Sequence, residues 1–195
     1  MKRIILSLIL SFIIIQCCAQ VAGGPTLGSY FVAKEFSKEI ALYRAKDFVV
    51  KNIFGKTSSV IEFEMDPLAA TSSGEVTSLV YNCKELKKEG LILGFFGMNL
   101  NDAGVVYQAY AFKDLPAPKA IELMEKIENI IKEKTKYLGE DANSNNIYFS
   151  YNDLTFIITI NVYTEIRIFW QGFDASWDGT AFKRTKKRLL KNLTK

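Results

Sequence analysis

The spacing of apolar residues divides the chain into helical and extended segments. Between Tyr30 and Phe54, apolar residues recur at steps of four, three, seven and four, which returns them to one face of a helix: Phe36, Ile40, Tyr43, Val50 and Phe54. Gly55 then provides a typical stop signal. The sequence therefore predicts a first helix with this set on one face, although "DFVV" could instead open a strand.

After this helix the period changes to two, as expected for strands. In "SVIEFEM", Ile61, Phe63 and Met65 alternate with glutamates, which predicts a half-buried strand. The segment "MDPLAATSSGE" contains Pro67, two serines and a glycine, and is predicted to be a loop. Further strands are predicted in "EVTSLVYNC", "GLILGFFGM" and "GVVYQAYAF", the last two joined as a hairpin across "NLNDAG".

The second half begins with the clearest helix, "DLPAPKAIELMEKIENIIKEKTKYLG". Pro118 suits its first turn and Gly139 its end, and its apolar positions form one face: Ala120, Leu123, Met124, Ile127, Ile130, Ile131 and Leu138. Three strands follow, "IYFSY", "LTFIITI" and "EIRIFWQGF", the first two separated by the turn pair Asn152–Asp153. A last helix is predicted over 175–193.

The predicted order is helix, four strands, helix, three strands, helix. Strands joined by such short turns must run antiparallel, because a parallel return needs a crossover of about a dozen residues. We therefore expect an α+β fold, with a largely antiparallel β-sheet of about seven strands and two to three helices packed on one face. The order of elements in the two halves suggests a duplicated unit, although their residues do not match.

The N-terminus has the three parts of a secretory signal peptide. Lys2 and Arg3 precede an apolar run, and Cys17 and Ala19 fill the small positions before a cut. We therefore expect a signal peptide over 1–19, export to the periplasm or the exterior, a flexible leader over 20–29 and a single domain over 30–195. Two alternatives stay open. One is a retained anchor, although the run is shorter than the roughly 17–25 residues that span a bilayer; the other is a lipoprotein.

Removal of residues 1–19 changes the charge and the cysteine content. The whole chain has 25 basic and 21 acidic residues and a net charge of +4. Without Lys2 and Arg3, 23 basic residues face 21 acidic ones, so the net charge falls to +2. Of three cysteines only Cys83 remains, so no internal disulfide can form and stability must come from a hydrophobic core.

The absence of histidine limits the chemistry that this chain can perform. It removes the usual general base, the usual zinc ligand and the Ser–His–Asp and Cys–His nucleophile systems. We expect a non-enzymatic protein with no catalytic residue, no cofactor and no metal. The alternative is a histidine-free enzyme that uses carboxylates such as Glu62 and Glu64, or the thiol of Cys83. Simpler interpretations are a solvated strand face for the glutamates and a core position for the cysteine.

Two segments are candidates for contact with a ligand or partner. In "FWQGFDASW", Trp170, Phe173 and Trp177 gather at a predicted strand-to-helix corner, and such rings are typical of interfaces and equally of a core hinge. The tail "KRTKKRLLKNLTK" over 183–195 has seven basic residues and no acidic one, which leaves 16 basic against 21 acidic residues in the rest of the cleaved chain. Its proposed contact residues are Lys186, Lys187 and Arg188.

Together these observations predict an exported, non-enzymatic domain that binds an unknown partner protein or small ligand. A basic amphipathic helix can also touch an anionic membrane surface, so weak membrane contact through the tail is a further alternative. A simpler interpretation is a solvated helix whose cations suit a helix C-terminus. Nucleic acid is not an expected partner of an exported chain.

Overall fold

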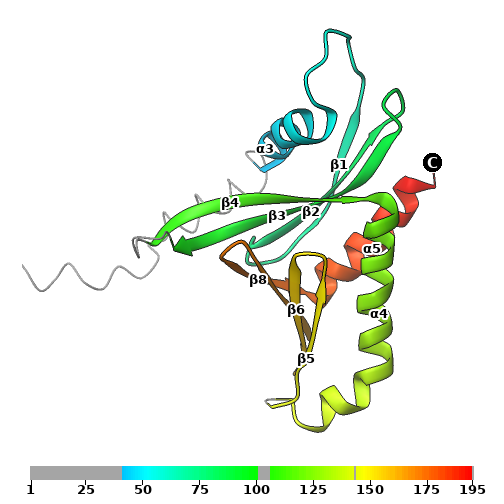
Figure 1. Cartoon of the computed structure of the whole chain (residues 1–195). Helices are drawn as coiled ribbons and strands as arrows, with labels where there is room; N and C mark the ends of the chain where they lie inside the picture. The colour runs from blue at the N-terminus through cyan, green and yellow to red at the C-terminus, as the bar shows by residue number, and fades with distance from the viewer. Residues whose placement is uncertain (1–40, 101–105, 143, 195) are drawn as a thin grey trace, which may run out of the picture. The chain divides into compact units, whose positions relative to one another are not determined.

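The structure is a computed structural model, and it describes residues 41–100, 106–142 and 144–194 (Figure 1). All of these residues belong to one of the two units into which the chain divides, Phe36–Lys195. The expected signal peptide, the leader, the first part of the first helix and most of the "NLNDAG" turn lie outside the described residues.

The described residues form eight strands and three α-helices, with a π-helical segment after the first helix. In chain order the elements are α3 (Ala41–Phe48), η2 (Val49–Phe54), β1 (Glu64–Ala70), β2 (Val76–Cys83), β3 (Lys88–Leu100), β4 (Val106–Pro116), α4 (Ala117–Glu140), β5 (Ile147–Tyr151), β6 (Leu154–Ile160), β7 (Thr164–Trp170), β8 (Phe173–Asp178) and α5 (Gly179–Leu193). Within the described part of the chain, no helix is both long enough and apolar enough to cross a membrane.

The strands form two antiparallel sheets of four strands each, in the orders β1-β2-β3-β4 and β5-β6-β7-β8. The predicted α+β class and the antiparallel pairing are confirmed. The single sheet of the prediction is in fact two sheets, because α4 interrupts the run of hairpins. Each sheet is followed by one helix, so both halves have the same order of four strands and a helix.

Strand β1 runs through part of the predicted loop. Pro67 lies inside the strand, and the pairing with β2 shifts between Pro67 and Ala69, which is a β-bulge. Because β1 is an edge strand, a proline can be accommodated there without breaking the ladder. The loop prediction is therefore wrong up to Ala70.

The last helix begins later than predicted, because Phe173–Asp178 forms strand β8. Gln171 and Gly172 have φ angles of 47° and 80°, which fits the two-residue turn of a β-hairpin. α5 then starts at Gly179, where the side chain of Asp178 accepts a hydrogen bond from the amide of Ala181.

The first helix ends as predicted, but only part of the predicted apolar set packs on the sheet: Phe54 lies against the cluster that contains Ala45 and Val49. Gly55, with a φ of 80°, ends η2. Tyr43 and Val50 are 72% and 42% exposed, whereas Ala45 and Val49 are buried. Both sets of residues satisfy helical spacing, and periodicity does not say which set faces the sheet. The π-helical turns of η2 also shift the period, so spacing counted through them is misleading.

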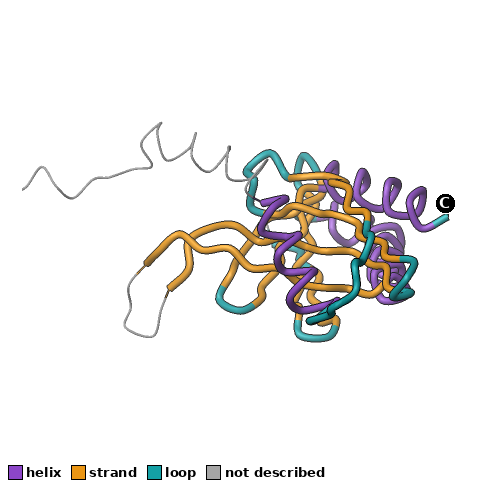
Figure 2. Tube along the Cα trace, turned by 90° about the horizontal axis from the view of Figure 1, so that it is seen from above, coloured by secondary structure: helices purple, strands orange, loops and turns teal. Residues whose placement is uncertain are grey.

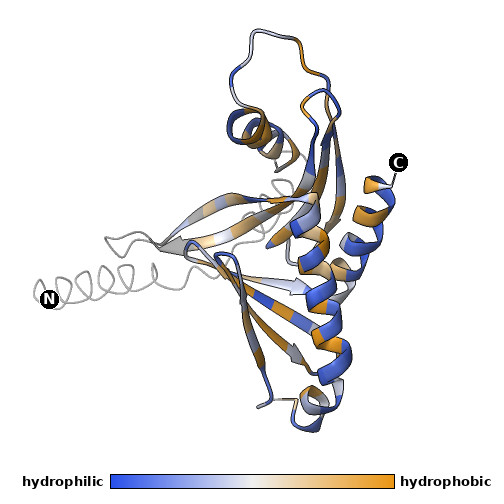
Figure 3. Ribbon diagram, turned by 45° about the vertical axis from the view of Figure 1, so that its right-hand side comes forward, coloured by the Kyte–Doolittle hydropathy of each residue, from blue (hydrophilic) through white to orange (hydrophobic). Residues whose placement is uncertain are grey.

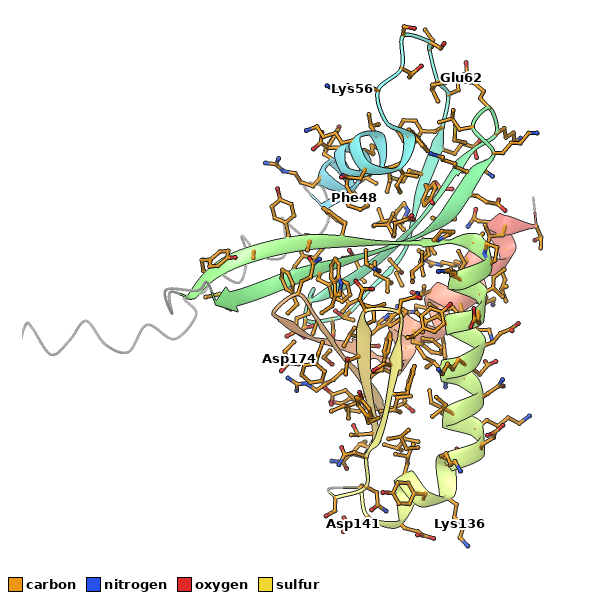
Figure 4. The ribbon with its side chains drawn as sticks, in the orientation of Figure 1. Phe48, Lys56, Glu62, Lys136, Asp141 and Asp174 are labelled. Carbon is orange, nitrogen blue, oxygen red and sulfur yellow. The ribbon has the colours of Figure 1, made fainter. Side chains whose placement is uncertain are left out.

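The first sheet is a central layer that is covered on both faces. On one face, α3 and η2 pack on a cluster that includes Leu79, Ile92 and Phe112, and Figure 4 labels Phe48, whose ring centroid lies 5.7 Å from that of Phe112. On the other face, α4, α5 and the second sheet share one core. The helices therefore cover two faces of this sheet rather than the single face that was predicted.

The hairpin of β3 and β4 extends beyond its neighbour. Pairing between β2 and β3 ends at Val76 and Phe95, whereas β3 and β4 remain paired as far as Leu100 and Val106. Figure 2 shows these two strands running on past the other strands of the sheet. The predicted hairpin is confirmed by this pairing, although its tip is not described.

Polar contacts fix α5 on the first sheet at the bulge of β1. The hydroxyls of Ser78 and Thr185 are 2.6 Å apart and buried. The Ser78 hydroxyl also accepts from the Ala69 amide and donates to its carbonyl, both at 3.1 Å, and the guanidinium of Arg188 donates to the carbonyl of Leu68. Ser78 of β2 and Arg188 of α5 thus satisfy backbone groups at the bulge of β1.

We expect Thr185→Val to lower the free energy of unfolding by about 0.5–1.5 kcal/mol, because one buried hydrogen bond is lost while the side-chain volume stays the same and Ser78 keeps its Ala69 partners. Thr180→Val makes the same chemical change at an exposed position of α5 and should stay within about 0.5 kcal/mol of the wild type. Urea unfolding measures both. Equal effects of the two variants would contradict this anchoring role.

Candidate functional site

One side of α5 presents a row of cations to solvent. Lys183, Lys187 and Lys191 recur every fourth residue and therefore lie on the same side, with Arg184 beside them, and all four are exposed. We call these four residues the basic face. From Lys183 to Lys191 it extends about 12 Å along the helix at roughly 1.5 Å per residue. The opposite side of α5 is buried in the core through Ala181, Phe182, Thr185 and Leu189.

The cations of the basic face are not neutralised by their surroundings. None of the four forms an ion pair with another described residue, and α5 contains no acidic residue. Figure 3 shows hydrophilic residues along α5. Because the chain outside 183–195 has 18 basic and 21 acidic residues, a net charge of −3, positive charge is concentrated at this helix.

The three tail residues proposed from the sequence have different surroundings. The Lys186 ammonium lies 2.5 Å from a carboxylate oxygen of Glu128 on α4, and Arg188 donates to the Leu68 carbonyl. Lys187 alone among the three belongs to the basic face. Whether any of them contacts a partner stays a prediction. Lys183, Arg184 and Lys191 were not among the expected contact residues, although the spacing of four residues that links Lys183 and Lys191 to Lys187 indicates a shared side.

The aromatic corner lies in the interior of the protein. Trp170, Phe173 and Trp177 are 7%, 5% and 1% exposed. The Trp170 ring lies 5.2 Å from that of Phe95 on β3, and the Trp177 ring lies 5.3 Å from that of Phe182 on α5, measured between centroids. These rings join the second sheet to the first sheet and to α5. Their proposed contact with a ligand or partner stays a prediction, and it would require them to become accessible.

A charged link to the first sheet holds Trp170 in position. The Trp170 indole N–H donates to Asp153 Oδ2 at 2.8 Å, and the Lys113 ammonium donates to Asp153 Oδ1 at 2.5 Å. The Lys113 hydrogen bond, aided by that of Trp170, keeps the pKa of Asp153 below its usual range despite the opposing effect of burial. The predicted turn at Asn152–Asp153 therefore also connects β5 and β6 to β4.

The carboxylates considered in the sequence lie on the exposed side of β1. Glu64 is in the strand, Glu62 precedes it, and both are exposed. Glu64 also lines a recess of about 280 Å³ with Asp66 and Lys84. Within the described ranges, no three His, Cys, Asp or Glu side chains are grouped so that they could hold a metal ion. Cys83 is buried and forms no disulfide.

We expect Trp177→Ala to lower the free energy of unfolding by about 3–5 kcal/mol, because it removes a large ring from the fully buried core. Tyr163→Ala removes an exposed ring and should change stability by no more than about 0.5 kcal/mol. Guanidinium unfolding followed by circular dichroism measures both variants. Unchanged stability of Trp177→Ala would show that this ring is not a core anchor.

The pKa of Asp153 predicts a dependence of stability on pH. Folding lowers this pKa, so the ion pair stabilises the fold at pH values above the unfolded-state pKa of about 3.9. This stabilisation is lost as the pH falls through the folded-state pKa of Asp153. Asp153→Asn and Lys113→Gln should each be less stable than the wild type at pH 7, and both differences should shrink toward pH 2. Double-mutant cycles at several pH values measure this coupling. A coupling energy that did not change with pH would contradict it.

Comparison with known proteins assigns neither a family nor a function to this chain. No family model matches the chain, no curated protein matches it, and no solved structure matches it.

Proposed function

We propose that this chain is an exported, non-enzymatic domain that binds an acidic partner protein through the basic face of α5. The observation that carries the proposal is the basic face itself: four exposed cations on one side of a fixed helix, without an ion pair to any described residue. Opposite charge on a partner would steer association and select the correct partner.

The anchoring of α5 supports recognition by a preformed surface. Its buried side is held by the contact between Ser78 and Thr185 and by the ion pair between Lys186 and Glu128. The backbone of the basic face is therefore ordered before a partner arrives, so binding does not have to include the cost of folding a helix. Only the long cationic side chains would lose freedom.

The distribution of apolar residues on α5 favours a protein partner over a membrane. An interfacial helix inserts an apolar face into the bilayer, but the apolar side of α5 is already packed in the core. One large apolar residue of α5, Leu190, is exposed to solvent, at 38%. A membrane could therefore attract this helix through charge only, at about 1 kcal/mol for each cation near an anionic surface.

The expectation of a non-enzymatic role rests on the residues available for catalysis. The chain has no histidine, and its free thiol at Cys83 is buried. Export is proposed from the N-terminal pattern alone.

The basic face can be tested by reversing its charge in one variant, Lys183→Glu, Arg184→Glu, Lys187→Glu and Lys191→Glu. We expect the wild type to bind fluorescein-labelled poly-glutamate at low salt and the variant to lose at least tenfold in affinity, because attraction becomes repulsion. Fluorescence anisotropy at 50 and 500 mM salt measures the binding and its screening.

A matched control replaces four exposed lysines of α4 by glutamate, which makes the same change in net charge. These residues are Lys119, Lys132, Lys134 and Lys136. Figure 4 shows Lys136 near the C-terminal end of that helix. The control should retain binding within about twofold. Equal losses in both variants would attribute binding to net charge and would refute a site on α5. Binding to phosphatidylserine vesicles but not to poly-glutamate would favour the membrane alternative.

A further inference from the structure

An open recess of about 520 Å³ lies on the side of the first sheet that carries η2. Residues from four parts of the chain line it: the end of η2, strand β2, the start of β3, and the junction of β4 with α4. Its walls include Ile53, Pro116 and Pro118, which offer apolar surface. The two prolines have no amide hydrogen, so this wall supplies few donors. The polar groups of the recess therefore determine what it can bind.

The central polar groups are Tyr81 and Asp114. Tyr81 is 2% exposed, and its hydroxyl donates to Asp114 Oδ1 at 2.9 Å. Strand β3 leaves room for this hydroxyl at Gly90, where a Cβ atom would lie 2.8 Å from it and 2.6 Å from the Leu115 carbonyl oxygen. The hydrogen bond thus joins β2 to β4 across β3, where Gly90 leaves room for the tyrosine side chain.

Asp114 retains unused capacity to accept hydrogen bonds. It is half-buried and lines the recess, and its second oxygen has no donor among the described residues. Burial raises the pKa of Asp114, against lowering effects of the Tyr81 hydrogen bond and of Lys113 and Lys88. Burial therefore outweighs these lowering effects. Donors on a ligand would supply what the protein does not.

The other charged groups of the recess are arranged around this carboxyl. The Lys88 ammonium donates to the Ile53 carbonyl, which holds the end of η2 at the recess. Glu89 and Lys87 are exposed at the lining. Glu89 adds a second carboxylate, and Lys87 and Lys88 add two cations, so the charges of the lining balance. The half-buried Asp114 carboxyl, whose second oxygen has no donor among the described residues, is the acceptor that the ammonium group of a ligand would meet.

From this geometry we propose that the recess binds a small organic amine, whose ammonium group donates to Asp114 and whose apolar body lies against Ile53, Pro116 and Pro118. This site is separate from the basic face, because the recess and α5 lie on opposite faces of the first sheet. Failure of one proposal would therefore leave the other intact.

The test uses n-butylamine as the probe in an NMR titration of the ¹⁵N-labelled chain at pH 7, with 1-butanol as the neutral control and butyrate as the anionic control. We expect amide shifts for the amine at the lining residues that carry an amide hydrogen, mainly 52–53, 87–89, 114 and 117. Affinity for 1-butanol and butyrate should be at least tenfold weaker. The pKa of Asp114, followed by the ¹³C shift of its carboxyl, should fall in the presence of the amine because a cation stabilises the charged form.

Asp114→Asn retains an acceptor for Tyr81 but removes the charge, and we expect it to weaken amine binding at least tenfold. Asp66→Asn makes the same change on β1, away from the recess, and should leave binding within twofold. Unaltered spectra up to 100 mM amine, shifts located elsewhere, or equal binding of 1-butanol would overturn the proposal. If Asp114→Asn does not fold, the pKa of Asp114 in the wild type is the test. A pKa that is the same with and without the amine would refute contact between the amine and Asp114.

Discussion

Packing of Phe95 against Trp170 and Phe173 is the contact on which the rest of this structure depends. Phe95 lies on β3 and the other two rings lie at the β7–β8 turn, with centroid distances of 5.2 and 6.2 Å. Each sheet has an apolar face that must be buried, and an isolated four-stranded sheet leaves that face in water. These rings join the two apolar faces in one core, and the Ser176 amide adds a hydrogen bond to Glu75 at 2.7 Å.

The shared core also determines where the two helices lie. α4 connects the sheets and packs on both, and α5 closes the core through Phe182 and Leu189. Because α5 is buried along one side, its remaining surface is polar, and its cations divide into those that hold the helix and those that face solvent. Lys186 and Arg188 are in the first group, and the basic face is in the second. The candidate protein-binding surface is thus a consequence of how the core is closed.

The second face of the first sheet provides a different environment. Here η2 packs on apolar residues of the sheet. An open recess remains beside it and is lined by Tyr81 and Asp114. Both proposed sites therefore depend on the first sheet being a central layer, since one lies beyond each of its faces. A charged helix surface suits a macromolecule, whereas a partly enclosed recess suits a small molecule.

The sequence by itself determined the α+β class, the antiparallel pairing of strands, the limits of α4 within a few residues and the concentration of positive charge near the C-terminus. These properties follow from local periodicity, turn residues and composition, which a chain carries before it folds. Tertiary structure alone decided that the strands form two sheets, that Tyr43 faces solvent and that Trp177 belongs to a strand. It also decided which cations of α5 are engaged and that Tyr81 meets Asp114, 33 residues away. Such contacts depend on strand register and helix placement, and these are set by the burial of surfaces that are distant in sequence.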